Sequence, residues 1–133
     1  MLDERIYQNY IGILKEEMIP AMGCTEPIAL AYGAARAREV LGKEPEHITA
    51  KCSGNIIKNV RCVIIPNSDG LTGIEAGVVL GAVAGNASLN MEVLSNVNES
   101  GRKRCRELLD KKICNVELLD SPVVLHFIIE MQA

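Results

Sequence analysis

Glycine recurs every four residues between Thr72 and Ala84, at Gly73, Gly77 and Gly81. In a helix, each of these glycines lowers the intrinsic stability by roughly 1 kcal/mol relative to alanine. A stripe of small residues is nevertheless typical of a helix whose backbone packs closely against another backbone. The pattern therefore predicts a helix from Thr72 to about Ala84 that is held in a close contact.

The composition indicates one globular domain with an aliphatic core. Of the 133 residues, 48% are hydrophobic and 23% are charged, with one Phe, three Tyr and no Trp. Most domains contain between about 50 and 200 residues, so residues 1–133 are expected to form a single domain. The scarcity of aromatic rings and the net charge of −3 argue against nucleic-acid and anionic-membrane partners. Small molecules or protein surfaces are the expected partners.

The spacing of apolar residues predicts four further helices. We expect an amphipathic helix from Tyr7 to Met18, an alanine-rich helix from Glu26 to Leu41, a short helix over 55–60, and a helix from about Asn98 to Lys112. Thr25 is a suitable N-cap for the alanine-rich helix, and Gly42 is suited to ending it. The residues from Pro66 to Gly70 are typical of a turn.

Three segments are expected to be strands. They are Glu46–Cys52, Cys114–Leu119 and Val123–Glu130. The short connection at 120–122 predicts that the last two strands pair as an antiparallel hairpin. Together the elements predict an α+β fold, with helices packed on a small, at least partly antiparallel sheet. Because the last strand is strongly apolar, we expect self-association or a partner segment to cover it.

The five cysteines are expected to be reduced thiols in a cytoplasmic protein. The acidic amino terminus does not resemble a secretory signal, and disulfides seldom persist in the cytosol. Cys24, Cys52, Cys62, Cys105 and Cys114 include no Cys-x-x-Cys pair and match no zinc or ferredoxin spacing. We therefore expect no metal ligands and no cofactor on this chain alone.

Cys24 is the candidate catalytic residue, within the segment Gly23-Cys24-Thr25-Glu26-Pro27. If Thr25 caps the following helix, Cys24 lies where free amides and the helix dipole favour an anion, which can lower a thiol pKa to about 3.5–7.5. Such a thiolate can act as a base, a nucleophile or a metal ligand. The alternative is that Cys24 is a small apolar residue in a tight turn and that Glu26 only stabilises the helix.

A second group of polar residues follows the strand that ends near Cys52. These residues are Ser53, Gly54, Asn55, Lys58 and Asn59. Loops after strands often bind ligands, and an ammonium group with loop amides can bind a carboxylate. The alternative is a polar turn whose Ser and Asn side chains cap a short helix. The residue types favour neither reading.

Taken together, these motifs resemble the iron–sulfur-dependent L-cysteine desulfidase family, also described as serine dehydratase-like alpha chains. The resemblance rests on Gly-Cys-Thr-Glu-Pro at 23–27, Ser-Gly-Asn-Ile at 53–56 with Lys58-Asn59, Ile65-Pro66, and the glycine-rich helix. It covers essentially the whole chain. It implies that the chain is the amino-terminal piece of a larger lyase.

The resemblance implies that the complete lyase converts L-cysteine to pyruvate, sulfide and ammonia with a [4Fe-4S] cluster held by a later portion. Cys24 then corresponds to the catalytic cysteine. Substrate binding is expected from Thr25 and Glu26 together with the second polar group. The alternatives are an L-serine dehydratase-like activity, or a non-catalytic module that binds a ligand or another subunit.

Overall fold

The structure is a computed structural model that describes residues 10–13, 25–120 and 126–133. Its elements along the chain are β1 (Tyr10–Ile13), α1 (Thr25–Leu41), β2 (His47–Ser53), α2 (Gly54–Val60), α3 (Ile74–Ala84), the 3-10 helix η2 (Ala87–Glu92), α4 (Glu99–Asp110), β3 (Cys114–Leu119) and β4 (His126–Gln132). None of the described helices is long and apolar enough to cross a lipid bilayer.

The four described strands form one mixed sheet in the order β1-β4-β2-β3. β4 pairs with β1 and with β2 in the antiparallel sense, whereas β2 and β3 are parallel. A parallel pair needs a long crossover, and the chain between β2 and β3 provides it with α2, α3 and α4. The predicted α+β class with a partly antiparallel sheet is confirmed.

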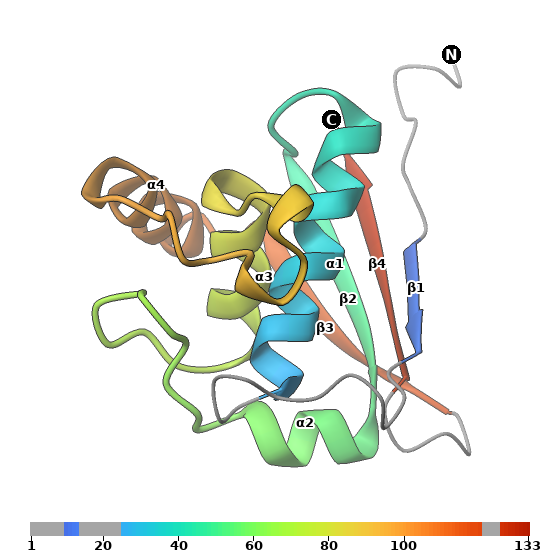
Figure 1. Cartoon of the computed structure of the whole chain (residues 1–133). Coiled ribbons are helices and arrows are strands. Elements are labelled where there is room, and N and C mark those ends of the chain that lie inside the picture. The colour runs from blue at the N-terminus through green and yellow to red at the C-terminus, as the bar shows by residue number, and fades with distance from the viewer. Residues whose placement is uncertain (1–9, 14–24, 121–125) are drawn as a thin grey trace.

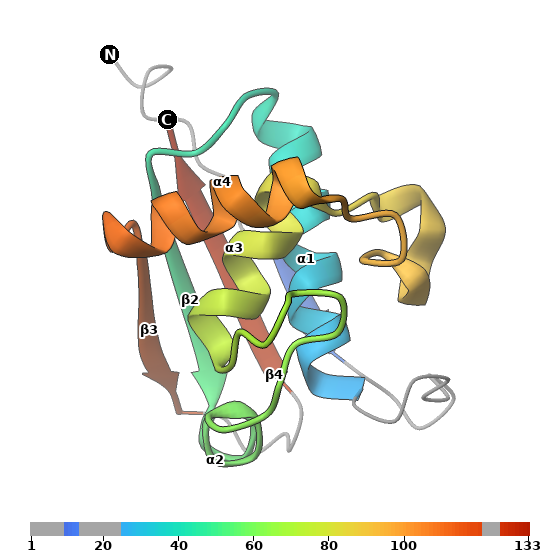
Figure 2. The same cartoon turned by 90° about the vertical axis from the view of Figure 1, so that its left-hand side faces the viewer.

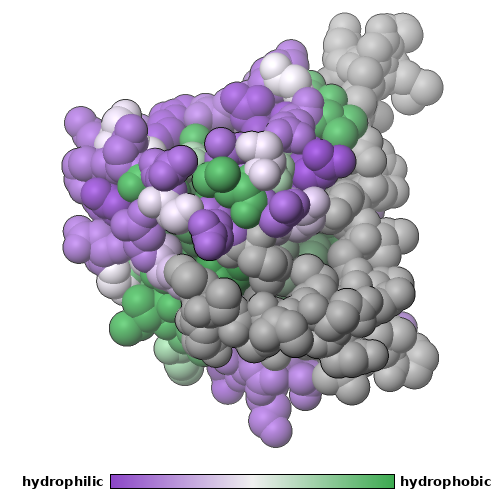
Figure 3. Space-filling view, in the orientation of Figure 1, coloured by the Kyte–Doolittle hydropathy of each residue, from purple (hydrophilic) through white to green (hydrophobic). Residues whose placement is uncertain are grey.

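The core lies between the sheet and the helices α1 and α3 (Figures 1 and 2). The residues of β2 and β4 that alternate toward these helices are at most 1% exposed. They are Ile48, Ala50, Cys52, Phe127, Ile129 and Met131. Their period of two is the alternation by which a strand buries one face. The coloured part of the surface in Figure 3 is mostly hydrophilic, with hydrophobic residues in small groups.

The glycine stripe forms a close contact between α3 and α1. A methyl group added to Gly81 would collide with the carbonyl oxygen and Cα of Ala31 on α1. Gly77 also lies near α1, because a Cβ built there would be 3.7 Å from the Pro27 oxygen. The predicted close-packed helix is confirmed, and its partner is the alanine-rich helix.

The prediction of a helix from Tyr7 to Met18 is wrong where the structure tests it. Tyr10–Ile13 is strand β1, which pairs with β4, and the rest of the predicted helix lies outside the described residues. Tyr and Ile favour strands, and the open edge of β4 offers this segment the hydrogen bonds of a ladder. Pairing with β4 thus decides the local structure of Tyr10–Ile13, and the spacing of apolar residues in the sequence does not reveal such a distant partner.

The predicted hairpin of the last two strands is also wrong. β2 lies between β3 and β4, so the two strands do not pair with each other. β4 is paired on both sides, so neither of its edges is free for the second copy or partner segment that the sequence led us to expect there. The apolar residues of β4 are buried within the chain. The edge strand next to β2 is β3.

The remaining predicted elements are confirmed with small shifts in their bounds. The alanine-rich helix begins at Thr25 itself and ends at Leu41, with Gly42 next in the left-handed region at a φ of 85°. β2, α2 and α4 correspond to the predicted strand and helices. Shifts of one or two residues at element ends are usual.

Candidate functional site

The described part of the first motif, at the start of α1, lies at the same end of the molecule as the second motif (Figure 1). There the first turn of α1 lies close to β2's carboxyl end and to α2, and α1 and α2 are in contact. The first turn of α3 joins them through the proximity of Gly77 to Pro27. We call this region the motif end: the first turn of α1, Ser53, α2 and the first turn of α3.

The residues of the first motif are described only in part. Cys24 lies outside the described residues, and Thr25 and Glu26 are placed as the first two residues of α1. The predicted role of Cys24 therefore stays a prediction. The structure does define the helix that begins directly after it, and Pro27 in that first turn is buried.

The residues of the second motif point in different directions. Ser53 is 2% exposed, whereas Gly54, Asn55, Lys58 and Asn59 are all exposed. Ser53 occupies the N-cap position of α2, but its side chain makes no capping hydrogen bond. Ser53 therefore does not cap α2 through its side chain, as the alternative interpretation of this motif expected. The exposed members leave this face of α2 open to a ligand or to another protein surface.

The loop before α3 is shaped by a buried serine and by residues in the left-handed region. The Ser68 hydroxyl donates to the Ile65 carbonyl at 2.6 Å and accepts the Leu71 amide at 3.0 Å. Gly73, at a φ of 96°, directly precedes α3 in a conformation that side chains rarely adopt. These contacts set where α3 begins and where its first acidic residue, Glu75, lies.

A small groove lies between α2, the start of α3 and β3. Its volume is about 140 Å³, and it is lined by Ile57, Arg61, Gly73, Ile74, Glu75 and Val116. Arg61 and Glu75 give it one cationic and one anionic group on an apolar floor. Sequence reasoning did not single out either residue, because they belong to segments whose proximity depends on the placement of β3.

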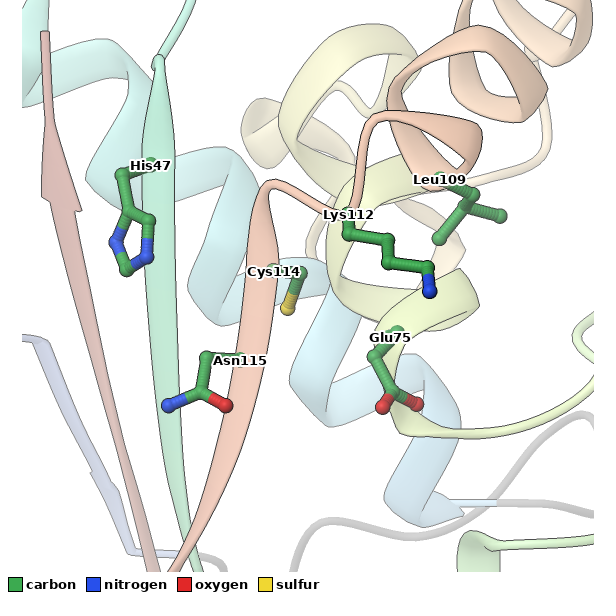
Figure 4. A pocket seen from close by; sticks show the side chains of 6 residues that line it. All are labelled: His47, Glu75, Leu109, Lys112, Cys114 and Asn115. Carbon is green, nitrogen blue, oxygen red and sulfur yellow. The ribbon is translucent and has the colours of Figure 1, made fainter.

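A larger open pocket of about 540 Å³ adjoins this groove, with Glu75 on the wall of both. In Figure 4, Glu75, Lys112 and Cys114 lie on the side of β3 that faces α3, whereas His47 and Asn115 lie on the other side. Leu109 completes the lining. The pocket offers a carboxylate and an ammonium group, which suits recognition of a polar ligand.

The Cys114 thiol in this pocket is poorly suited to acting as a nucleophile. Burial raises the pKa of Cys114 to about 12, and the negative charge of Glu75 acts in the same direction. Burial likewise raises the pKa of Cys52 and of Cys105 to about 12. These three thiols are therefore protonated at neutral pH, and Cys62 is the exposed cysteine among the described ones.

The described residues do not fit a metal centre or an iron–sulfur cluster. No group of three or more His, Cys, Asp or Glu side chains is placed to hold a metal ion in the ranges that the structure describes. Iron–sulfur clusters need several thiolates around one point. Two of the described cysteines are instead fully buried in the apolar core, at Cys52 and Cys105.

Known proteins similar to this chain carry the name UPF0597 protein. The relative from Desulfitobacterium hafniense is 47% identical over 128 residues, covering 96% of this chain and 30% of the relative. Relatives from Treponema denticola and Finegoldia magna are 46% and 52% identical over 94% and 84% of this chain. The chain thus spans under a third of the length of these relatives. No family model and no solved structure matches it.

These relatives correct the family resemblance drawn from the motifs. None of the three carries the name of an iron–sulfur cysteine desulfidase; they are UPF0597 proteins. The assignment to the desulfidase family is therefore wrong. A short motif such as Gly-Cys-Thr-Glu-Pro at a helix start is also good capping chemistry, so it can occur without a particular activity.

Proposed function

We propose that this chain contributes one wall of the substrate site of a lyase that acts on a small amino acid, with L-cysteine as the first candidate and L-serine as the second. One observation supports the proposal: residues from α1, β2, α2 and α3 meet at the motif end, and Cys24 directly precedes α1 in the sequence. Separate segments that meet beside a groove are typical of a binding site.

In the proposed reaction, a base removes the proton from Cα of cysteine while sulfide leaves from Cβ. The resulting enamine takes up water and releases ammonia, so that cysteine and water give pyruvate, ammonia and hydrogen sulfide. Cys24 is the candidate base, since a thiol beside a helix start can be ionised at neutral pH. Lys58 and Asn55, both exposed on α2, are the candidate groups for the substrate carboxylate.

The remaining parts of the site would come from the length of the relatives that this chain does not span. A [4Fe-4S] cluster was expected only through the family resemblance, and the described residues do not fit one. No step of the proposed reaction is routed through it. We further infer a cytoplasmic location, which is supported by the four described cysteines all being free thiols.

The test is an activity assay on a chimera in which this chain replaces the matching part of the Desulfitobacterium hafniense relative. Sulfide and pyruvate released from L-cysteine, and pyruvate from L-serine, are measured under anaerobic conditions. We expect Cys24→Ser to lower turnover by about 100-fold or more, as for the loss of a general base. Cys62→Ser is the matched control, because Cys62 is exposed and outside the motif end.

Two outcomes would contradict the proposal. The lyase assignment fails if the chimera folds but releases no pyruvate from either amino acid. The role of Cys24 fails if Cys24→Ser and Cys62→Ser retain equal turnover in an active chimera.

A second candidate function is a non-catalytic module that binds another protein. The observation that favours it is the open edge of β3, where Leu118 is 69% exposed. A folded, inactive chimera that still associates through this edge would support this second function.

A further inference from the structure

β3 presents an open edge of the sheet. Figure 2 shows it as the outermost strand beside β2, and among the described strands it pairs with β2 alone. A strand edge of this kind carries unpaired N–H and C=O groups, which can pair with another strand. The outer edge of β3 can therefore form backbone hydrogen bonds with another strand.

The register with β2 identifies these groups. The Ile48 amide donates to the Ile113 carbonyl at 2.8 Å, with Ile48 and Cys114 as partners in the parallel ladder. Because backbone groups alternate in direction along a strand, the odd-numbered residues of β3 bond to β2. The N–H and C=O groups of Cys114, Val116 and Leu118 consequently point away from the sheet.

The side chains of β3 divide between the two faces of the sheet. Cys114, Val116 and Leu118 align with core residues of β2 on the helix side, but none of them is fully buried, and Leu118 is 69% exposed. Asn115 and Glu117 lie on the opposite face and are exposed, with the Asn115 amide donating to the Glu117 carboxylate at 3.2 Å. The edge is thus apolar on one face and polar on the other.

We propose that β3 pairs with β3 of a second copy of this chain, antiparallel and centred on Val116, to make one continuous sheet across the dimer. Val116 then lies opposite Val116 of the second copy, and Cys114 lies opposite Leu118. All three outward-facing residues form hydrogen-bonded pairs in this register, which satisfies their backbone groups. The inference is independent of the proposed lyase activity.

The second copy is favoured over an unrelated strand because the sequence of this segment is complementary to itself. In this register Asn115 lies opposite Glu117 of the second copy, so that an amide donor faces a carboxylate at two equivalent places. Outside the strand, Lys112 lies two residues before Cys114 and comes near Asp120 of the second copy, which lies one residue after Leu119; both are exposed. Opposite polar groups of this kind stabilise cross-strand pairs.

A neighbouring register gives a poorer match. Centring the pair on Glu117 would also keep the outward-facing residues paired, but it would put two like charges directly opposite each other. The Val116 register avoids this contact and covers the exposed Leu118 side chain. It is also an isologous contact, the commonest type in soluble dimers.

The test is sedimentation velocity of this chain over a wide concentration range, with two substitutions at one exposed position. Asn115→Asp puts a negative charge across from Glu117 of the second copy at two equivalent places. Asn115→Lys puts a positive charge there instead. We expect a reversible dimer whose dissociation constant rises by roughly 2- to 30-fold with Asn115→Asp and falls by a similar factor with Asn115→Lys. Both changes in the dissociation constant should be smaller at high salt concentration.

A third variant tests the backbone pairing. Val116→Pro removes an amide that points outward and leaves the β2 ladder intact, so it should abolish the dimer while circular dichroism stays unchanged. The proposal is overturned if the chain is monomeric at all concentrations, as expected if β3 pairs with a different strand in the longer relatives. It is equally overturned if a dimer forms with the same affinity in Val116→Pro, or if the two Asn115 variants shift the affinity in the same direction.

Discussion

β3 and β4 are neighbouring strands in the chain that occupy opposite environments in the sheet. β4 is paired on both edges, and Phe127, Ile129 and Met131 are at most 1% exposed. Among the described strands, β3 pairs with β2 alone, and its residue Leu118 is 69% exposed. The difference teaches that position in the sheet, rather than the apolarity of a strand, decides which strand is left open.

The consequences extend to the layers around each strand. β4 lies beneath α1, which is itself locked against α3 by the glycine stripe. β3 instead borders the groove and the pocket that share Glu75. We therefore expect changes near β4 to act on folding, and changes near β3 to act on binding and association.

The largest effect is expected from Gly81→Val in the contact between α3 and α1. The added side chain collides with the backbone of Ala31, which no rotamer change can relieve, so the loss of stability should be about 3 kcal/mol or more. Chemical denaturation measures it. Gly54→Ala is the matched control beside β3, where the nearest atom to an added methyl is Leu118 Cδ1 at 3.7 Å. Equal losses of stability in Gly81→Val and Gly54→Ala would contradict the difference between the two regions.

Cysteine labelling should separate the interior from the exposed surface by rate. Burial raises the pKa of Cys52 and of Cys105 to about 12, so at neutral pH the thiolate fraction of each is roughly one-thousandth of that of an ordinary cysteine. Because the pKa is raised, labelling of the native protein should accelerate only as the pH rises toward 12. Mass spectrometry of labelled peptides should find Cys62 modified first. Labelling of Cys52 as fast as Cys62 in the folded chain would contradict the assigned burial.

Truncation of one apolar side chain on each strand compares the two strands directly. Ile129→Ala should lower the free energy of unfolding by about 2–5 kcal/mol, since it leaves a cavity in the core. Leu118→Ala should change it by less than about 0.5 kcal/mol at concentrations where the chain is monomeric. Urea denaturation measures both. A large loss with Leu118→Ala in the monomer would mean that β3 is covered within the chain.

The smallest effect is expected from an ion pair on the surface. Arg104 of α4 donates through Nε to Glu44 at 2.9 Å, and this hydrogen bond holds the pKa of Glu44 below its usual value of 4.5. A lowered carboxyl pKa stabilises the fold above the unfolded value, and the contribution is lost as the pH falls through the folded value. Both side chains are more than a third exposed, so a double-mutant cycle at pH 7 should give less than about 1 kcal/mol. A coupling energy between Arg104 and Glu44 that is the same at pH 2 as at pH 7 would contradict the predicted loss of this contribution at low pH.

Most helices and three strands of the fold could be predicted from local patterns. Capping residues and small-residue spacing locate α1 and α3, and alternation and apolar runs locate β2, β3 and β4. What could not be predicted is pairing between distant segments. Tyr10–Ile13 becomes a strand because β4 lies beside it, and the 114–119 strand is separated from 126–132 because β2 lies between them.

The candidate site could be predicted only in outline. The described residues of the two motifs do lie at one end, since the start of α1 and the end of β2 meet there. Arg61, Glu75 and Lys112 were not foreseen, because each is an ordinary surface charge until the fold places Arg61 and Glu75 on the small groove and Glu75 and Lys112 on the adjoining pocket. Their sequence neighbourhoods contain no motif that marks them.

The most direct test of the contrast between the two strands is amide hydrogen exchange followed by NMR on a dilute, monomeric sample. We expect every amide of β4 from Ile128 to Glu130 to be protected. In β3 the Asn115 and Glu117 amides should be protected, while those of Val116 and Leu118 exchange quickly. Protection of Val116 and Leu118 equal to that of Ile129 in the monomer would contradict the open edge and the register from which the dimer is inferred.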